Sequence, residues 1–188
     1  MQVIYLQSNG LISGTLPSDL GAGLPGLRYL QFDRNRIEGA LPPTLGELAH
    51  LETLDGGHNR LSSSIPETLG KLHELRLLKL NDNSLTGGIP PELGKMIRLT
   101  ELDLYNNAFS GDFPSEMADL SNLRLLYVPN EQLLPVRMRY CNKRIANVGK
   151  YSWRLVREEY GRMINSLCHE PFSTLQQFST LSEIAGDV

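Results

Sequence analysis

The stretch LRLLKLNDNSLTGGIPPELGKM, residues 75–96, decides the fold of this chain. Its opening leucines follow the pattern L-x-x-L-x-L, in which apolar and other residues alternate with a period of two. Such alternation predicts a short β-strand with one buried face. Asn83 comes directly after the strand, where its amide can satisfy backbone groups of neighbouring turns. Pro90 then ends the extended segment, and a short arc returns the chain to the start of the next strand.

This pattern occurs five times in the first two thirds of the sequence. The aligned asparagines have spacings of 26, 24, 24 and 24 residues, and they are Asn9, Asn35, Asn59, Asn83 and Asn107. Eight residues before each asparagine lies Met1 or a leucine, and two residues after it lies Leu11, Ile37, Leu61, Leu85 or Phe109. One such unit cannot bury its own apolar face, whereas a stack of at least three can. The sequence therefore predicts an α/β solenoid, curved, with a parallel β-sheet on its concave side.

The full pattern, LxxLxLxxNxLxGxIPxxLGxL, resembles the plant-type leucine-rich repeat of receptor ectodomains, inhibitors of cell-wall enzymes and many protist proteins. The resemblance covers residues 1–134, in about six repeats. It implies a right-handed superhelix that serves as a non-catalytic scaffold and binds a protein or peptide on its concave strands. Two departures stand out: the chain has no N-terminal cysteine-bearing cap, and Gly56 replaces a buried leucine in the third repeat. We expect larger neighbours to fill the space at Gly56.

Alternate residues of a strand point to opposite sides, so the third, fifth, seventh and eighth positions of each repeat should project from the concave face. Tyrosines lie toward both ends of this face, and acidic residues outnumber Arg34 and Lys79 between them. The predicted partner-binding residues are Tyr5, Tyr29, Asp33, Asp55, His58, Lys79, Asp82, Glu101, Asp103, Tyr105 and Tyr127. A partner with a basic or amide-rich segment would complement this face. The alternative is that the charges only keep the surface soluble.

Beyond the repeats the charge reverses. Residues 1–136 carry ten basic and sixteen acidic side chains, whereas residues 137–188 carry eight basic and five acidic ones. Residues 135–188 are therefore predicted to be a separate basic helical cap and tail, with an amphipathic helix over 151–168 for which Ser152 is a candidate N-cap. A secondary basic surface is expected to face an acidic protein, and it comprises Arg137, Arg139, Lys143, Arg144 and Lys150. Cys141 and Cys168 are either small buried residues of the cap or a disulfide that staples it.

Other functions find little support in the sequence. No strongly basic domain or recognised motif indicates nucleic-acid binding, and no apolar run is long enough for a transmembrane span. The four histidines are scattered, so the sequence predicts no enzyme, no metal site and no cofactor. The absence of a signal peptide, a glycosylation sequon and a cysteine cap favours an intracellular location. The second functional hypothesis is a structural or accessory subunit of a larger complex, docked through the basic cap, the tail and the open N-terminal edge.

Overall fold

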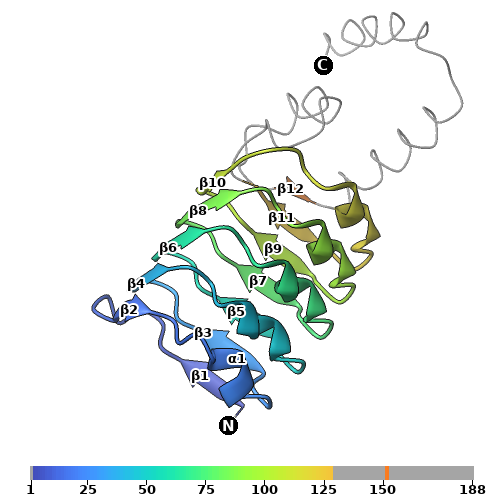
Figure 1. Cartoon of the computed structure of the whole chain (residues 1–188). Coiled ribbons are helices and arrows are strands. Elements are labelled where there is room, and N and C mark those ends of the chain that lie inside the picture. Colours follow the sequence, from blue (N-terminus) through green and yellow to red (C-terminus); the bar gives the residue numbers. More distant parts are fainter. Residues whose placement is uncertain (1, 129–150, 153–188) are drawn as a thin grey trace, which may run out of the picture. The chain divides into compact units, whose positions relative to one another are not determined.

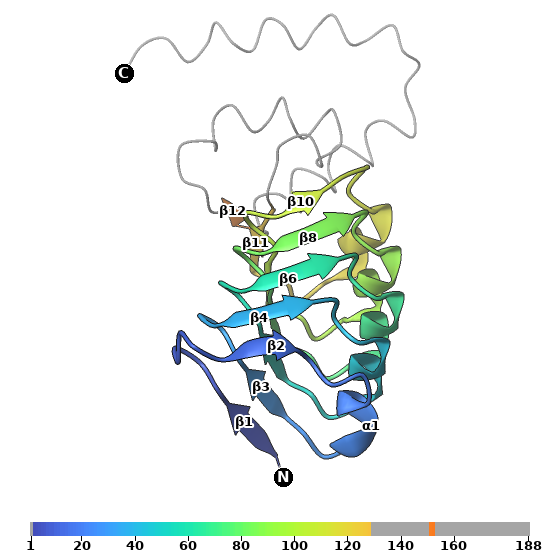
Figure 2. The same ribbon diagram turned by 60° about the vertical axis from the view of Figure 1, so that its left-hand side comes forward.

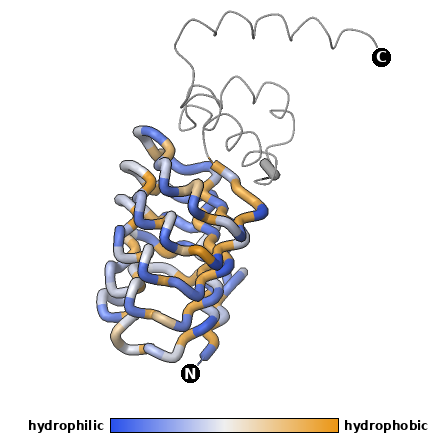
Figure 3. The backbone as a smooth tube through the Cα atoms, turned by 90° about the vertical axis from the view of Figure 1, so that its right-hand side faces the viewer, coloured by the Kyte–Doolittle hydropathy of each residue, from blue (hydrophilic) through white to orange (hydrophobic). Residues whose placement is uncertain are grey.

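The computed structural model describes residues 2–128 and 151–152. The chain divides into two compact units, Met1–Arg154 and Leu155–Val188, and every described residue belongs to the first. Over residues 2–119 the chain winds into successive coils, each with a strand, a turn, a second short strand and a helical arc (Figure 1). Apolar stretches recur at matching places in successive coils (Figure 3). The predicted solenoid is therefore confirmed.

The first strand of each coil joins one sheet of seven strands, in the order β1-β3-β5-β7-β9-β11-β12. Six strands are parallel and in register across each repeat, for example Leu54 opposite Leu78. They are β1 (Val3–Tyr5), β3 (Tyr29–Gln31), β5 (Thr53–Asp55), β7 (Leu77–Lys79), β9 (Glu101–Asp103) and β11 (Leu125–Tyr127). In β3 to β11 the middle residue is buried and its two neighbours point outward, as the period of two predicts.

A second sheet, which the sequence pattern did not predict, lies on another side of the coils (Figure 2). Its order is β10-β8-β6-β4-β2, again parallel. The strands are β2 (Ser13–Thr15), β4 (Arg36–Gly39), β6 (Arg60–Ser63), β8 (Ser84–Gly87) and β10 (Ala108–Phe109). The longest of them, β4, β6 and β8, carry a single buried residue each, Ile37, Leu61 and Leu85, so no alternation of apolar residues marks them in the sequence.

Short helices form the return arcs: α1 (Leu20–Gly23), followed by the 3₁₀ helices η1 (Pro43–Glu47), η2 (Glu67–Lys71), η3 (Pro91–Lys95) and η4 (Ser115–Asp119). Neighbouring arcs stack so closely that the glycine of the PxxLGxL pattern is required. A Cβ atom on Gly70 would lie 2.4 Å from the backbone oxygen of Glu92 in the next coil. The recurrent glycine is therefore a packing requirement between coils.

The repeat asparagines tie each coil to the one before it. The Asn83 side chain donates to the carbonyl oxygens of Leu80 and Asn81 in its own coil, at 3.1 Å each. It also donates to the Gly56 oxygen of the previous coil at 3.0 Å and accepts from the Leu61 N–H at 2.9 Å. Asn59 and Asn107 repeat this arrangement. The predicted role of the asparagines, to satisfy backbone groups of adjoining turns, is confirmed.

The space at Gly56 is filled as expected. A Cβ atom there would lie 2.6 Å from Cζ of Phe32, which stands at the equivalent position of the preceding coil. Phe32 is almost fully buried. The larger aromatic side chain thus occupies the volume that the missing leucine would take, and Gly56 is a packing compensation.

The first coil departs from the sequence alignment. Leu11 was aligned with the buried Ile37, but Leu11 is 75% exposed, and Gly14 is the register partner of Ile37. The first repeat is two residues longer than the others, so its second strand begins later relative to Asn9. The shift also removes one of the hydrogen bonds that the later asparagines make. Oδ1 of the buried Asn35 has no hydrogen-bond partner, whereas Oδ1 of Asn59, Asn83 and Asn107 accepts an N–H from the preceding coil. The prediction that Leu11 and Ile37 occupy equivalent positions in their coils is therefore wrong.

At the other end of the larger sheet, β12 (Tyr151–Ser152) pairs antiparallel with β11. The helix predicted over 151–168 does not include these two residues, which form a strand. The rest of that helix, the boundary at residue 134, the basic surface residues Arg137 to Lys150 and the cysteines Cys141 and Cys168 all lie outside the described residues.

Asn83→Ala is expected to lower the free energy of unfolding by about 3 kcal/mol, because it leaves several buried backbone groups of two coils without partners. Asn9→Ala is the matched control, since Asn9 bonds only within its own coil and is exposed; its cost should be about 1 kcal/mol or less. Chemical denaturation of both variants gives the comparison. If both variants lost the same free energy of unfolding, the hydrogen bonds of Asn83 between coils would not be the cause of its effect.

Ser63→Gly is expected to stabilise the protein by up to about 1 kcal/mol. Ser63 has a positive φ, a left-handed backbone conformation that is unfavourable for residues with a Cβ atom but not for glycine. Glycines occupy the equivalent positions 39, 87 and 111, all at positive φ. Ser64→Gly, one residue along and without a positive φ, should instead destabilise by loosening the unfolded chain. Denaturation midpoints separate the two. A loss on Ser63→Gly would show that its side chain matters more than the backbone.

Candidate functional site

The outward side chains of the larger sheet form continuous rows. We call them, with the turn residues that follow each strand, the sheet face; it spans β1, β3, β5, β7, β9 and β11. The central row is set by the strand register and runs Tyr5, Gln31, Asp55, Lys79, Asp103 and Tyr127. Neighbouring strands lie roughly 4.8 Å apart, so the face is on the order of 25 Å wide. All eleven predicted face residues belong to the strands or turns of this side.

The middle of the sheet face carries a compact charged group, the Lys79 cluster, made of Asp55, Lys79, Glu101 and Asp103. Lys79 Nζ lies 2.9 Å from Glu101 Oε1, and the register places Lys79 between the two aspartates. Burial has the largest influence on the Lys79 pKa and lowers it, but the hydrogen bond to Glu101 and the surrounding carboxylates raise the pKa on balance. The cluster therefore holds one cation among three carboxylates.

Burial makes the two aspartates of the cluster unusual. It raises the pKa of Asp55 and of Asp103 above the ordinary value, and it outweighs the backbone N–H groups of Gly57 and Tyr105 that hydrogen-bond to them. The ionised form of each carboxylate is thus less favourable in the folded protein than in water. A cation from a binding partner would relieve this cost.

A second polar group lies at the turn beside the Lys79 cluster. His58 Nδ1 is 3.3 Å from Asp82 Oδ2, and Asn106 donates to Asp82 Oδ1 at 2.7 Å. All three residues occupy the position before the repeat asparagine, and all three have positive φ angles. Because consecutive coils repeat this turn, their side chains stand in one row. His58 and Asp82 are thus brought together, and both belong to the predicted set.

The tyrosines of the face are not equivalent. Tyr29 donates its hydroxyl to Glu52 Oε2 at 3.1 Å, and Glu52 also pairs with Arg28. The hydrogen bond from Arg28 is the largest influence on the Glu52 pKa and helps to hold it below its ordinary value. Tyr5 and Tyr105, in contrast, are about half exposed, at 56% and 49%. Tyr5 and Tyr105 are therefore the more exposed tyrosines of the face, whereas Tyr127, on the last strand of the row, is half-buried.

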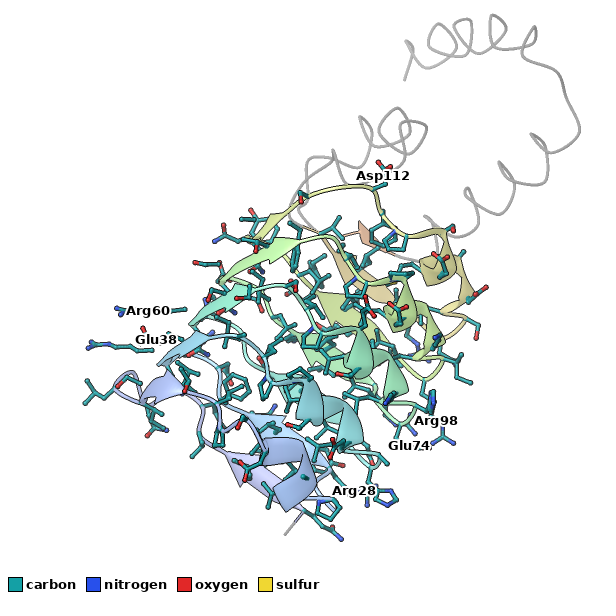
Figure 4. All side chains as sticks on the ribbon, in the orientation of Figure 1. Arg28, Glu38, Arg60, Glu74, Arg98 and Asp112 are labelled. Atoms are coloured by element: carbon teal, nitrogen blue, oxygen red, sulfur yellow. The ribbon has the colours of Figure 1, made fainter. Side chains whose placement is uncertain are left out.

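Sequence reasoning missed Arg28 and Glu52, which flank the face at the second position of their repeats. Their signal was available: opposite charges 24 residues apart occupy equivalent positions in adjacent coils. Glu74 and Arg98 form a similar pair, one position before the leucine, and lie beside each other in Figure 4. Such pairs between coils support the stack, and Arg28–Glu52 also fixes the Tyr29 ring.

In residues 2–128 and 151–152, no group of three or more His, Cys, Asp or Glu side chains could hold a metal ion. None of the helices in this part of the chain has the length and apolar character needed to cross a membrane.

The repeating coils, joined by hydrogen bonds of their asparagines, are found in a known protein family. A family model described as "Leucine-rich repeat region" matches residues 2–146. The chain belongs to the leucine-rich repeat family. Leucine-rich repeats are in general a non-catalytic fold for interactions, in which stacked repeats present an extended binding surface.

Solved structures similar to this leucine-rich repeat protein include ectodomains of plant receptor kinases. The LRR ectodomain of GASSHO1/SCHENGEN3 from Arabidopsis thaliana, in complex with CASPARIAN STRIP INTEGRITY FACTOR 2, is 38% identical, with a TM-score of 0.63. The ectodomain of HAESA from Arabidopsis, in complex with an extended IDA peptide hormone, is 32% identical, with a TM-score of 0.59. The BIR3–SERK2 complex from Arabidopsis thaliana contains a chain with 37% identity and a TM-score of 0.56.

These similarities cover 66%, 65% and 60% of the leucine-rich repeat chain, respectively. The chain spans 15%, 23% and 60% of the corresponding known chains, so it corresponds to only part of each. No curated protein matches the chain by sequence. The similarity to plant receptor ectodomains agrees with the plant-type repeat pattern.

Asp55→Asn and Asp103→Asn should each raise the free energy of unfolding at neutral pH. Because the folded pKa is raised, the ionised carboxylate costs stability as pH rises from the unfolded pKa through the folded one. The gain should vanish in acid, where the wild-type carboxylates are protonated in both states. Urea denaturation across pH gives the measurement, with Asp112→Asn, at an exposed loop residue, as the control. A gain that persists in strong acid would contradict the burial argument.

Proposed function

We propose that the sheet face binds a polypeptide whose basic or amide-rich segment lies across the Lys79 cluster. The observation that carries the proposal is this group of three carboxylates and one lysine at the centre of a continuous six-strand face. A surface on the order of 25 Å wide suits a polypeptide better than a small metabolite.

The chemistry of the cluster supports a cationic partner. Asp55 and Asp103 retain carboxylates where burial disfavours their charge, which is a cost to the free protein. Lys79 neutralises only part of the group, since Glu101 is its direct partner at 2.9 Å. A lysine or arginine side chain of a partner would add the missing positive charge, and complementary charge favours both specificity and rapid association.

The aromatic residues supply contact area beside the charges. Tyr5, in β1, and Tyr105, in the turn after β9, are both exposed. Tyrosine offers a large contact surface at a low cost in conformational entropy, and it is enriched at protein interfaces. Tyr29 is held by Glu52 and so presents a fixed ring edge rather than a mobile side chain.

Known relatives in fold bind polypeptides, which supports this type of function. The similar ectodomains were solved with CASPARIAN STRIP INTEGRITY FACTOR 2 and with a peptide hormone, and BIR3 was solved with SERK2. The second hypothesis, an accessory subunit docked through the basic cap, concerns Arg137, Arg139, Lys143, Arg144 and Lys150. These residues lie outside the described part of the chain, so that hypothesis stays a prediction.

A selection from a displayed library of random peptides tests the proposal on the 188-residue chain. The selected peptides should be enriched in Lys, Arg, Asn and Gln. Asp103→Ala and Tyr105→Ala should each weaken a selected peptide by about tenfold or more, as central interface residues do. Asp112→Ala is the matched control for lost charge, and Ile97→Ala is the control for a lost exposed apolar side chain.

Two results would contradict the proposal. One is a selection with no basic or amide enrichment; the other is binding that Asp103→Ala and Tyr105→Ala leave unchanged. Loss of binding only in Arg139→Ala/Lys143→Ala/Arg144→Ala would instead favour docking through the basic cap.

A further inference from the structure

The two aspartates of the Lys79 cluster have matching backbone environments. In the central row Lys79 lies between them, with Asp55 on one neighbouring strand and Asp103 on the other (Figure 1). Asp55 Oδ1 accepts the N–H of Gly57 at 3.2 Å. Likewise, Asp103 Oδ1 accepts the N–H of Tyr105 at 3.0 Å. In each case the donor follows the aspartate by two residues. A functional difference between the two aspartates therefore has to come from the side chains around them.

Tyrosines occupy two positions next to Asp103 whose equivalents next to Asp55 are not aromatic. Tyr105 follows Asp103 by two residues and is 49% exposed, whereas the equivalent residue after Asp55 is a glycine. On the next strand, away from the lysine, Tyr127 is in register with Asp103, and Gln31 is in register with Asp55. Neighbouring strands lie roughly 4.8 Å apart, so these register partners are side by side. Asp103 thus has a tyrosine in both positions.

Asp103 also lacks a cation of its own. Among the described residues no basic side chain forms an ion pair with it, because the ammonium group of Lys79 pairs with Glu101 at 2.9 Å. The Asp103 side chain is only partly buried, so a side chain of a partner can reach the carboxylate from the solvent side of the sheet face. The carboxylate can therefore accept a cation from a partner beside the exposed Tyr105.

Arginine is the side chain whose chemistry fits these surroundings. Its planar guanidinium can donate two N–H groups to one carboxylate and can also stack against an aromatic ring. The ammonium group of lysine is compact and strongly hydrated, and it contacts aromatic rings less often than the guanidinium of arginine does. A carboxylate with tyrosines beside it should therefore favour arginine, whereas a carboxylate beside a glycine and an amide has no aromatic ring in these positions to make that distinction.

We propose that Asp103, Tyr105 and Tyr127 form an arginine-selective position on the sheet face. The arginine of the partner donates to the Asp103 carboxylate while its guanidinium stacks on the ring of Tyr105, and Tyr127 borders the position on the β11 side. This inference rests on the proposed function, and it specifies which basic residue the partner carries and where that residue binds. The arginine lies over β9 rather than over β5, where Asp55 is the equivalent carboxylate.

The peptides selected on the 188-residue chain provide the probe. They should contain arginine in preference to lysine. One selected peptide is then compared with a version in which lysine replaces each arginine, and fluorescence anisotropy of the labelled peptides gives both dissociation constants. The wild-type protein should bind the arginine version about tenfold more tightly.

Variants of the protein locate the source of this preference. Tyr105→Leu should abolish it, because leucine keeps an apolar side chain but removes the ring, whereas Tyr105→Phe should retain it. Asp103→Asn should weaken binding of the arginine version more than that of the lysine version. Asp55→Asn is the matched control, and it should weaken both versions alike and so leave the preference unchanged. Circular dichroism checks that each variant is folded.

The outcomes distinguish this inference from the proposed function. Binding that depends on Asp103 but is equally tight for the arginine and lysine versions would overturn the inference alone. So would a preference that survives Tyr105→Leu, or one that Asp55→Asn removes as fully as Asp103→Asn. Selected peptides that carry lysine or amides but no arginine would have the same meaning. A selection without basic or amide enrichment would overturn the proposed function, and this inference with it.

Discussion

The side-chain amides of Asn59, Asn83 and Asn107 each hold carbonyl groups of two consecutive coils and accept an N–H from the earlier coil. Turns of this tightness leave backbone groups that no strand or helix satisfies, and such groups are costly when buried. In these three coils one amide meets that need at the same place in the turn. The stacking distance, the strand register and the close approach of the arcs at Gly70 all follow from coils held in this way.

The strand register places residues that are one repeat apart in the sequence next to each other on the sheet face. Residues 24 positions apart become neighbours on the sheet face, so that Asp55, Lys79 and Asp103 form one row although 48 positions of chain separate the first from the last. The buried residue of each strand is nearly always leucine, while its outward neighbours differ from coil to coil. The buried positions thus maintain the scaffold, whereas the outward positions carry the charge pattern that we propose as a binding site.

The sequence predicted the larger sheet and its outward residues because leucines and asparagines repeat with a strict period. It did not reveal the second sheet, because β4, β6 and β8 carry only one buried residue each and so show no alternation. Nor did it place Leu11, because two extra residues shift the first coil after Asn9. The Tyr29–Glu52 contact depends on side-chain directions rather than on spacing, and the raised pKa values of Asp55 and Asp103 depend on local burial. Neither feature can be read from the spacing of residues in the sequence.

The missing hydrogen bond at Asn35 has a consequence for motion. In a stacked protein, each coil is stabilised by the coils next to it. Asn59, Asn83 and Asn107 each accept an N–H from the preceding coil, whereas Oδ1 of Asn35 has no hydrogen-bond partner. The junction between the coils of β1 and β3 is therefore held less firmly than the junctions that follow it. Local opening should occur more often at this junction, so the amide hydrogens that bond β1 to β3 should exchange faster than those that bond β5 to β7.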